Sequence, residues 1–227
     1  MLATFTRVTP NLGRKTCKMV IKENESNSRQ GEGGMVPRLR FPDFRNASPW
    51  EEKRLGDVFE ITRGYVLATT ETSTNFSESS PYPVYSSQTK NKGLMGFYSQ
   101  YLYENALTWT TDGANAGDVN LRLGKFYCTN VCGVLLNKEG YANLCVSELL
   151  NTVTPQYVSY VGNPKLMNGV MAKIKIPLPS LKEQRKIADC LTSLDEVITA
   201  QTAKLEALKA HKQALMQQLF PQGEIST

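Results

Sequence analysis

The sequence predicts an α+β protein in which a globular, strand-rich domain is followed by a long C-terminal coiled-coil helix. Between Trp50 and Pro179, short aromatic and apolar segments are separated by Gly, Asn, Ser and Pro, a pattern typical of strands and turns. Between Pro179 and Pro221 there is no proline, and apolar residues recur with heptad spacing. The 227 residues are enough for one domain with its own core and an appendage.

Four segments follow from this pattern. A flexible N-terminal extension is predicted because the stretch from Asn24 to Gly34 is polar, rich in glycine and has almost nothing to bury. The segments are the extension over 1–35, the globular domain over 36–179, the long helix over 180–220 and a short tail over 221–227.

Within the globular domain, local patterns predict the order of helices and strands. RLGDVFEITRG, from Arg54, indicates a short helix or turn followed by a strand, and PYPVYSSQTKNKGLMGFY, from Pro81, indicates aromatic strands around a polar loop. The stretch 106–136 predicts a strand, a loop rich in Gly and Asn, and further strands. A helix is predicted within 146–160, interrupted or ended at Pro155.

The start of the C-terminal helix is well marked. Pro177 and Pro179 exclude an earlier helix, and Ser180 is a favourable N-cap because its hydroxyl can accept a hydrogen bond from a free backbone amide. Glu183, three residues later, predicts a capping box, in which its carboxylate bonds back to the N-cap amide. A helix reaching Phe220 would be about 60 Å long at about 1.5 Å per residue, which is longer than a domain of this size can cover.

One apolar stripe runs along this helix. With Leu191 at heptad position a, the a and d positions are Ile187, Leu191, Leu194, Ile198, Gln201, Leu205, Leu208, Lys212, Leu215 and Leu219. A stripe without cover inside the chain needs a partner helix, from a second copy or from another protein. The polar residues Gln201 and Lys212 would cost stability at a helix interface and would favour one register or partner over others.

The sequence contains few residues suited to catalysis. We therefore expect that the protein is not an enzyme and has neither a cofactor nor a metal site. The single histidine, His211, falls inside the predicted helix, where general-base chemistry has no positioned partner. The five cysteines are scattered without CxxC spacing, which indicates reduced thiols rather than zinc ligands or disulfides. A metal-dependent nuclease built on Asp43 and Glu51 is an alternative, although Pro49 and the short interval leave little room for the strand pair that would hold both carboxylates.

No apolar run approaches the roughly 20 residues needed to cross a bilayer, and no N-terminal apolar segment indicates secretion. We therefore expect a cytoplasmic protein without membrane contact. The formal net charge of +5 favours a polyanionic partner, but basic residues would have to cluster locally to form such a site.

Two polar loops combine basic residues with side chains able to read DNA base edges. They are SSQTKNKG, over 86–93, and TTDGANAGDVNLRLGK, over 110–125. The predicted contacts to the DNA backbone are Lys90, Lys92, Arg122 and Lys125. The predicted base readers are Ser87, Gln88, Asn91 and Asn115. Solvated turns without a ligand are the alternative interpretation of both loops. The residues interpreted as core or core-edge aromatics rather than base-stacking platforms are Tyr65, Tyr85, Tyr98, Trp109 and Tyr127.

The start of the helix resembles a known family. PLPSLKEQRKIADCLTSLDEVI, with its Pro-Leu-Pro start, Glu183, Gln184 and Leu191, closely resembles the conserved helical region of type I restriction-modification specificity subunits. RLGDVFEITRG, YPVYSSQTKNKGLMGFY and GKFYCTN resemble landmarks of a target recognition domain in that family, and VPRLRFPDFRNASPWEEKRLGDV resembles the beginning of such a subunit. The resemblance extends from about Val36 to Pro221.

The resemblance implies a non-catalytic subunit that binds double-stranded DNA. In this family a target recognition domain reads one part of a split site, and a long helix packs antiparallel against a second conserved helix as a spacer. Methyltransferase and restriction subunits assemble with it. The sequence contains one such domain and one such helix, so it resembles a half subunit that acts as a homodimer, as part of a split pair, or as a truncation product.

Pairing two copies through antiparallel C-terminal helices would bury both apolar stripes. Such a homodimer has two-fold symmetry and would recognise a palindromic bipartite site whose spacer is set by the helix. A second hypothesis is a helical adaptor, in which both the stripe and the globular domain bind other proteins rather than DNA.

Overall fold

The computed structural model describes part of the chain. The described residues are 35–87 and 90–220; the predicted extension over 1–34, the predicted tail over 221–227 and the predicted base reader Gln88 lie outside them. Met35, which the sequence placed in the extension, is paired with Trp50. Met35 N donates to Trp50 O at 3.3 Å, and Trp50 N donates to Met35 O at 2.8 Å.

The described chain is an α+β structure, as predicted. Its strands are β1 (Glu51–Arg54), β2 (Glu60–Arg63), β3 (Tyr82–Tyr85), β4 (Leu94–Tyr98), β5 (Tyr103–Thr110), β6 (Val119–Cys128), β7 (Cys132–Leu136) and β8 (Lys175–Leu178). Its α-helices are α1 (Leu55–Val58), α2 (Leu144–Val153), α3 (Asn168–Met171) and α4 (Leu181–Leu219). Short 3-10 helices are η1 (Pro42–Phe44), η2 (Thr69–Glu71), η3 (Asn91–Gly93) and η4 (Thr154–Tyr157). The predicted helix near Pro155 is therefore α2, and η4 continues it through that proline.

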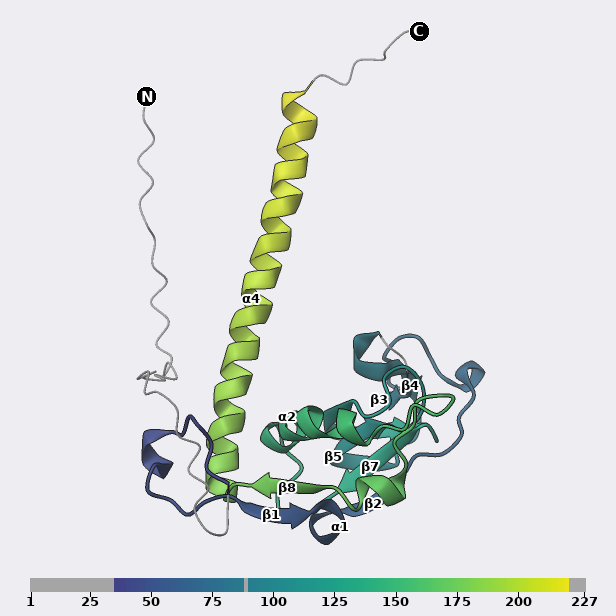
Figure 1. The fold of residues 1–227 in the computed structure, drawn as a ribbon. Coiled ribbons are helices and arrows are strands. Elements are labelled where there is room, and N and C mark those ends of the chain that lie inside the picture. The colour runs from purple at the N-terminus through teal and green to yellow at the C-terminus, as the bar shows by residue number, and fades with distance from the viewer. Residues whose placement is uncertain (1–34, 88–89, 221–227) are drawn as a thin grey trace.

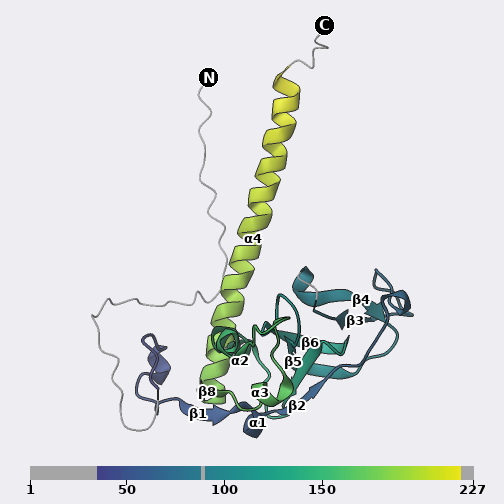
Figure 2. The same ribbon diagram turned by 45° about the vertical axis from the view of Figure 1, so that its right-hand side comes forward.

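Six strands form the main sheet in the order β2-β7-β5-β6-β3-β4, and β1 and β8 form a separate antiparallel pair. Figures 1 and 2 show β3 and β4 on the side of the domain away from α4. The β1–β8 pair joins the segment before the domain to the segment before α4, with Glu51 opposite Leu178 and Arg54 opposite Lys175. The β1–β8 pair thus lies at the base of α4, and the β3–β4 edge of the main sheet lies far from it.

The larger core lies between the main sheet and α2. Trp109, Leu107 and Leu135 from the sheet pack with buried residues of α2 and of the segment 166–178. The Trp109 indole N–H donates to Leu166 O at 2.9 Å, so this buried donor is satisfied. A Cβ atom at Gly133 would lie 2.1 Å from the Trp109 ring, and only glycine fits there.

The β5–β6 ribbon bends at a bulge. Asn105 (φ 49°) and Gly124 (φ 72°) are both in the left-handed region, where the pairing register of the two strands shifts. Gly124 N donates to Asn105 Oδ1 at 2.8 Å, which holds the two bent strands together. Beyond the bend, Cys128 and Cys132 join Phe126 in a smaller second core. The bend therefore brings the end of β6 close to the start of β7, although β5 lies between these two strands in the sheet.

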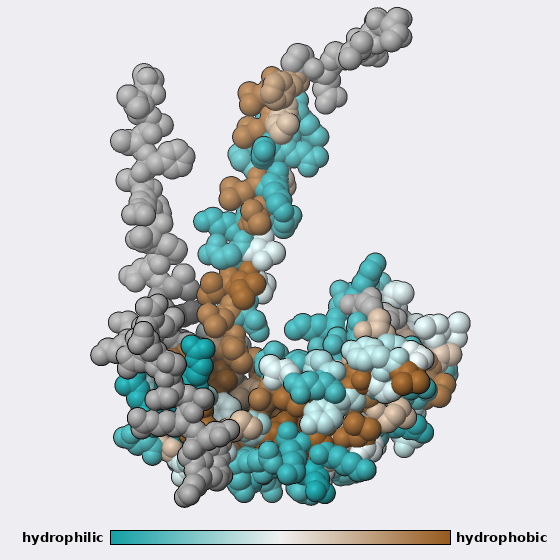
Figure 3. All heavy atoms as spheres, viewed as in Figure 1, coloured by the Kyte–Doolittle hydropathy of each residue, from teal (hydrophilic) through white to brown (hydrophobic). Residues whose placement is uncertain are grey.

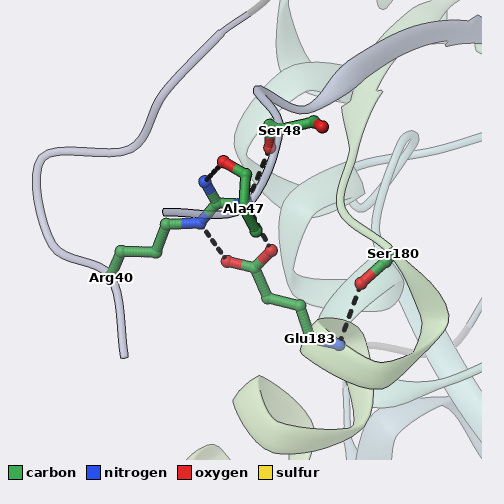
Figure 4. A network of polar contacts seen from close by, with 5 residues as sticks. All are labelled: Arg40, Ala47, Ser48, Ser180 and Glu183. Atoms are coloured by element: carbon green, nitrogen blue, oxygen red, sulfur yellow. Dashed lines mark hydrogen bonds and ion pairs between the residues drawn. The ribbon is translucent and has the colours of Figure 1, made fainter. Parts of the chain in front are cut away.

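The long helix begins where the sequence predicts. Ser180 is the N-cap of α4, and its hydroxyl accepts a hydrogen bond from Glu183 N at 3.4 Å. The predicted capping box is wrong in its second half, because the Glu183 carboxylate binds Arg40 instead (Figure 4). Arg40 Nε lies 2.7 Å from Glu183 Oε1, and its terminal nitrogen lies 2.7 Å from Oε2.

This ion pair is enclosed, and Arg40 makes four hydrogen bonds in it. The Arg40 and Glu183 side chains are 7% and 1% exposed, and Arg40 also donates to Ala47 O at 2.8 Å and to Ser48 O at 2.9 Å. The bond to Glu183 raises the pKa of Arg40, which keeps the guanidinium charged. The ion pair fixes the N-terminal segment to the first turn of α4.

The next residue, Gln184, ties the same turn to α2. Gln184 Nε2 donates to Pro179 O at 2.8 Å, and its Oε1 accepts from Asn143 Nδ2 at 2.7 Å. Asn143 is itself the N-cap of α2, accepting from Val146 N at 3.1 Å. The two helices therefore share one buried polar network at their N-termini.

Beyond its first turns, α4 projects away from the domain (Figures 1 and 2). Figure 3 shows apolar side chains distributed along it to its far end. Ile198, Leu205 and Leu208 are 61%, 52% and 57% exposed. None of the helices in the described part of the chain combines the length and apolar character needed to span a membrane.

Removing one member of the buried ion pair should cost far more stability than removing one member of an exposed pair. Glu183→Gln leaves the Arg40 charge buried without its carboxylate and should lower the free energy of unfolding by about 3 kcal/mol. The matched control is Glu52→Gln, because Glu52 lies 2.9 Å from Lys175 with both side chains more than half exposed. The control should lose less than about 1 kcal/mol. Urea titration followed by circular dichroism measures both, and equal losses would contradict the role given to the ion pair.

Candidate nucleic-acid interface

Four segments meet near the end of β6. Tyr65 N donates to Cys128 O at 3.2 Å, which places the segment after β2 there. Thr129 N donates to Tyr85 O at 2.9 Å, which adds the segment after β3, and Thr111 N donates to Val131 O at 2.9 Å, which adds the segment after β5. We refer to residues 64–65, 86–93, 111–118 and 129–131, within the described chain, as the loop surface.

The β3–β4 loop has an unusual backbone within this surface. Asn91 (φ 51°), Lys92 (φ 52°) and Gly93 (φ 85°) are three successive left-handed residues. Non-glycine residues rarely adopt this region, and the surrounding structure must hold them there. Ser86 N donates to Gly93 O at 2.8 Å, and Gly93 N donates to Lys90 O at 3.0 Å, which closes the loop on itself.

Arg122 holds this loop from beneath. Its side chain is buried, its Nε donates to Thr108 Oγ1 at 3.0 Å, and its terminal nitrogen donates to Lys92 O at 2.6 Å. The guanidinium lies over the Tyr85 ring, 3.6 Å from its centre. Burial lowers the pKa of Arg122 below the usual range of a guanidinium. The sequence assigned Arg122 to the DNA backbone, but here its bonds support the loop from inside the protein.

The other predicted DNA-binding residues are accessible to different degrees. Lys90, Asn91 and Lys92 are exposed on the β3–β4 loop, and Ser87 on the same loop is half-buried. Asn115 is half-buried in the loop after β5, whose backbone is fixed by the Asp118 N to Asn115 O bond of 3.0 Å. The bonds of Thr111 to Val131 and of Thr129 to Tyr85 thus place the starts of both predicted loops beside the turn after β6, whereas residues 119–125 of the second loop belong to β6.

Lys125 lies on β6, just after the bend. Its ammonium group lies 4.5 Å from the centre of the Tyr101 ring, and it is opposite Glu104 in the β5–β6 register. The bond with Tyr101 raises the pKa of Lys125, so the group stays charged. Lys125 therefore presents its charge beside an aromatic ring.

Tyr65 is an exposed aromatic that the sequence interpretation placed at the core edge. It is 64% exposed, whereas Trp109 and Tyr127 are buried and Tyr85 and Tyr98 are half-buried. A tyrosine directly after Gly64 at the end of a strand was the available signal, since turn residues that follow strands usually face solvent. Tyr65 adds an aromatic surface of the kind on which bases stack.

The described cysteines, Cys128, Cys132, Cys145 and Cys190, are reduced thiols and are buried. Burial raises the pKa of Cys132 to about 11 and that of Cys145 to about 12, and it also raises the pKa of Cys128. At neutral pH these groups are protonated thiols. Within residues 35–87 and 90–220, no group of three or more His, Cys, Asp or Glu residues is placed to hold a metal ion.

The two acids of the nuclease alternative lie in separate elements. Asp43 is in η1 and Glu51 is in β1, where its carboxylate lies 3.3 Å from Lys53 Nζ. Glu51 thus contacts a lysine of its own strand.

The predicted partner residues of α4 fall into two groups. Ile187 and Leu191 are half-buried and line a cavity of about 260 Å³ with Phe41 and Trp50. The exposed group comprises Leu194, Ile198, Gln201, Leu205, Leu208, Lys212, Leu215 and Leu219. The stripe therefore begins in the cavity and continues along the projecting part of the helix.

Comparison with known proteins indicates one family. A family model described as the type I restriction modification DNA specificity domain matches residues 47–210. The N-terminal part of a putative type I specificity subunit from Mycoplasma pneumoniae is 39% identical over 141 residues, which cover 61% of this chain and 74% of that protein. The specificity subunit of the MpnII type I restriction enzyme from the same organism is 36% identical over 154 residues, 66% of this chain and 45% of that subunit.

Solved structures have the same fold. The crystal structure of a type I restriction-modification S subunit from M. genitalium aligns with a TM-score of 0.60 at 20% identity, over 81% of this chain and 48% of that one. A structure described under complex assembly and conformational transition of the type I R-M system aligns with a TM-score of 0.52 at 20% identity, over 75% and 43% of the two chains. The chain thus spans about half the length of these two proteins.

Replacing Arg122 by lysine should loosen the β3–β4 loop while keeping the positive charge. Lysine has no planar fork to bond Thr108 and Lys92 O together, so the loop loses a buried bond. We expect the Ser86 amide, which is bonded to Gly93 O, to exchange its hydrogen about ten-fold faster, as a loss of about 1.4 kcal/mol predicts. Hydrogen exchange followed by mass spectrometry or NMR measures this. Lys125→Arg on the same strand is the control, and equal protection in Arg122→Lys would contradict the supporting role.

Proposed function

This chain belongs to the type I restriction-modification DNA specificity family, and from that membership we propose that its globular domain reads one half of a bipartite DNA site. The matching family model and relatives make the chain a specificity subunit. Specificity subunits of this family are non-catalytic, so the chain is not an enzyme. The family implies recognition of a DNA sequence.

The loop surface is the proposed reading surface. The observation that carries this assignment is the left-handed run at Asn91, Lys92 and Gly93, held from beneath by the buried Arg122. Strained backbone that is fixed by a buried charged group is a feature of binding sites, because it places exposed side chains at defined positions. Lys90 and Lys92 would contact phosphates, while Asn91 would reach base edges. Tyr65 would lie beside them on the same surface.

The long helix is the proposed spacer and pairing element. Its apolar stripe is exposed from Leu194 to Leu219, and the contact of such a stripe with water is unfavourable. Two copies pairing antiparallel would bury both stripes and place their recognition domains at opposite ends. The dimer would have two-fold symmetry, and its target would be palindromic with an unspecified spacer.

Methyltransferase and restriction subunits are the proposed protein partners. The membership of the chain in the specificity family supports this, since these subunits supply the chemistry that the specificity subunit lacks. The faces of α4 outside the stripe carry charged residues and remain available for such docking when the stripes are paired.

The test of sequence recognition begins with the motif. Methylome sequencing of a host with and without the gene should show loss of one palindromic, bipartite motif. Binding of the protein to DNA with this motif is then measured by fluorescence anisotropy over a range of salt concentrations. A Lys90→Ala and Lys92→Ala double variant should weaken binding to all sequences and reduce the salt slope by about 0.9 for each phosphate that is no longer neutralised.

The matched control for this experiment is Lys173→Ala, which removes an exposed lysine just before β8. It should leave the salt slope unchanged. If no motif is lost and the wild-type protein binds DNA without preference, recognition by this chain is wrong, and the adaptor hypothesis, in which the domain binds protein, gains support.

Replacing Leu205 and Leu208 together by glutamate should separate the proposed dimer. Four unpaired carboxylates would then lie in one apolar interface. Removing each of them from water is strongly unfavourable, so the dimer should dissociate. Sedimentation equilibrium at micromolar concentration should give a dimer for the wild type and a monomer for the variant. The control places the same two charges opposite the stripe, as Ala203→Glu with Ala210→Glu, at exposed f positions of the heptad. A monomeric wild type, or an unchanged mass of the variant at Leu205 and Leu208, would contradict helix pairing.

A further inference from the structure

The cavity lined by Ile187 and Leu191 is a groove at the base of α4. It has a volume of about 260 Å³, and its walls come from the N-terminal segment and from the first three turns of the helix. Most of the lining is apolar, with Leu39, Phe41 and Trp50 on one side and Ile187 and Leu191 on the other. The groove is therefore suited to a large apolar side chain.

The groove is continuous with the exposed stripe of α4. Ile187 and Leu191 are the first two positions of the heptad pattern, and they line the groove. The following positions, from Leu194 onward, are exposed along the same face. A helix that covers the stripe over its full length must therefore cross the groove.

Heptad geometry selects one register for an antiparallel copy. In such a pair, position a of one helix faces position d of the other. One register satisfies this for all ten positions. Its pairs are Ile187 with Leu219, Leu191 with Leu215, Leu194 with Lys212, Ile198 with Leu208, and Gln201 with Leu205.

The neighbouring registers are less favourable. A shift of one heptad in one direction leaves Leu215 and Leu219 unpaired and places Lys212 against Ile187, inside the apolar groove. A shift in the other direction leaves the groove empty and places Gln201 against Lys212. The register that fills the groove is thus also the one that buries most apolar surface.

We infer that the groove receives the last turn of α4 from a second copy of the chain. Leu219 of that copy would pack on Ile187, and Phe220 would fill the space beside Phe41 and Trp50. Both residues are exposed in the single chain, at 73% and 64%. This inference rests on the proposed antiparallel pairing and adds its register and its end contacts.

Electrostatics favour the same occupant. The last turn of α4 has no basic residue, so its free carbonyl groups and the negative end of its dipole lack a cationic partner within the helix. Arg45 lines the groove. A helix C-terminus that enters the groove would therefore meet a positive charge.

The experiment combines sedimentation with tryptophan fluorescence on the full chain. Trp109 is only 1% exposed, so iodide quenching reports mainly on Trp50 in the groove wall. On dilution of the wild type, quenching of Trp50 should rise as the dimer dissociates. A Leu219→Ser and Phe220→Ser variant should raise the dimer dissociation constant at least ten-fold, and its Trp50 should be quenched at concentrations where the wild type is protected.

The matched control replaces two exposed apolar residues of the globular domain, Leu123→Ser and Val161→Ser, which are 75% and 92% exposed. It should change neither measurement. If Leu205→Glu with Leu208→Glu separates the dimer but the variant at Leu219 and Phe220 behaves as the wild type, the groove assignment is wrong and helix pairing stands. If the wild type is monomeric throughout, or if the variant Leu205→Glu with Leu208→Glu remains a dimer, helix pairing and the groove assignment are both wrong.

Discussion

The ion pair between Arg40 and Glu183 is the constraint on which the geometry of this chain depends. It joins residues 143 positions apart and fixes the first turn of α4 to the segment that precedes β1. At about 1.5 Å per residue, the 39 residues of α4 make a lever of about 58 Å, so a rotation of about 10° at its base would move its far end by about 10 Å. The spacer role proposed for α4 would need a base that cannot rotate, and the bonds of Gln184 to Pro179 and Asn143 provide a second attachment.

Two buried arginines serve the two proposed functional ends of the molecule. Arg40 fixes the helix, and Arg122 fixes the loop that carries Lys90, Asn91 and Lys92. In both cases a planar guanidinium bonds a side-chain oxygen and a backbone carbonyl from distant segments, which a lysine ammonium cannot do with the same geometry. Each buried charge therefore has acceptors within the fold, and its burial gives positional precision without an unpaired charge.

The sequence predicts what local rules decide and fails where distant contacts decide. Pro179, Ser180 and the heptad pattern predict the start and length of α4, because proline geometry and capping act within a few residues. The same reasoning predicts a local bond for Glu183, whereas the actual partner lies in a segment that no local rule connects to it. Arg122 carries the charge of a phosphate contact, but burial depends on the bent β5–β6 ribbon and the returning β3–β4 loop. The exposure of Tyr65 likewise depends on tertiary packing.

The position of the groove links helix pairing to the rigidity of the helix base. Arg40 and Glu183 both line the groove that the second copy would fill. The pair is already almost fully enclosed, so filling the groove would only remove the last contact of the Arg40 side chain with water, and a charge pair in a drier environment interacts more strongly. Pairing would thus stiffen the joint that orients α4 in each copy. The separation of the two recognition domains would then be set jointly by helix length, by register and by the two ion pairs that fix the helix bases.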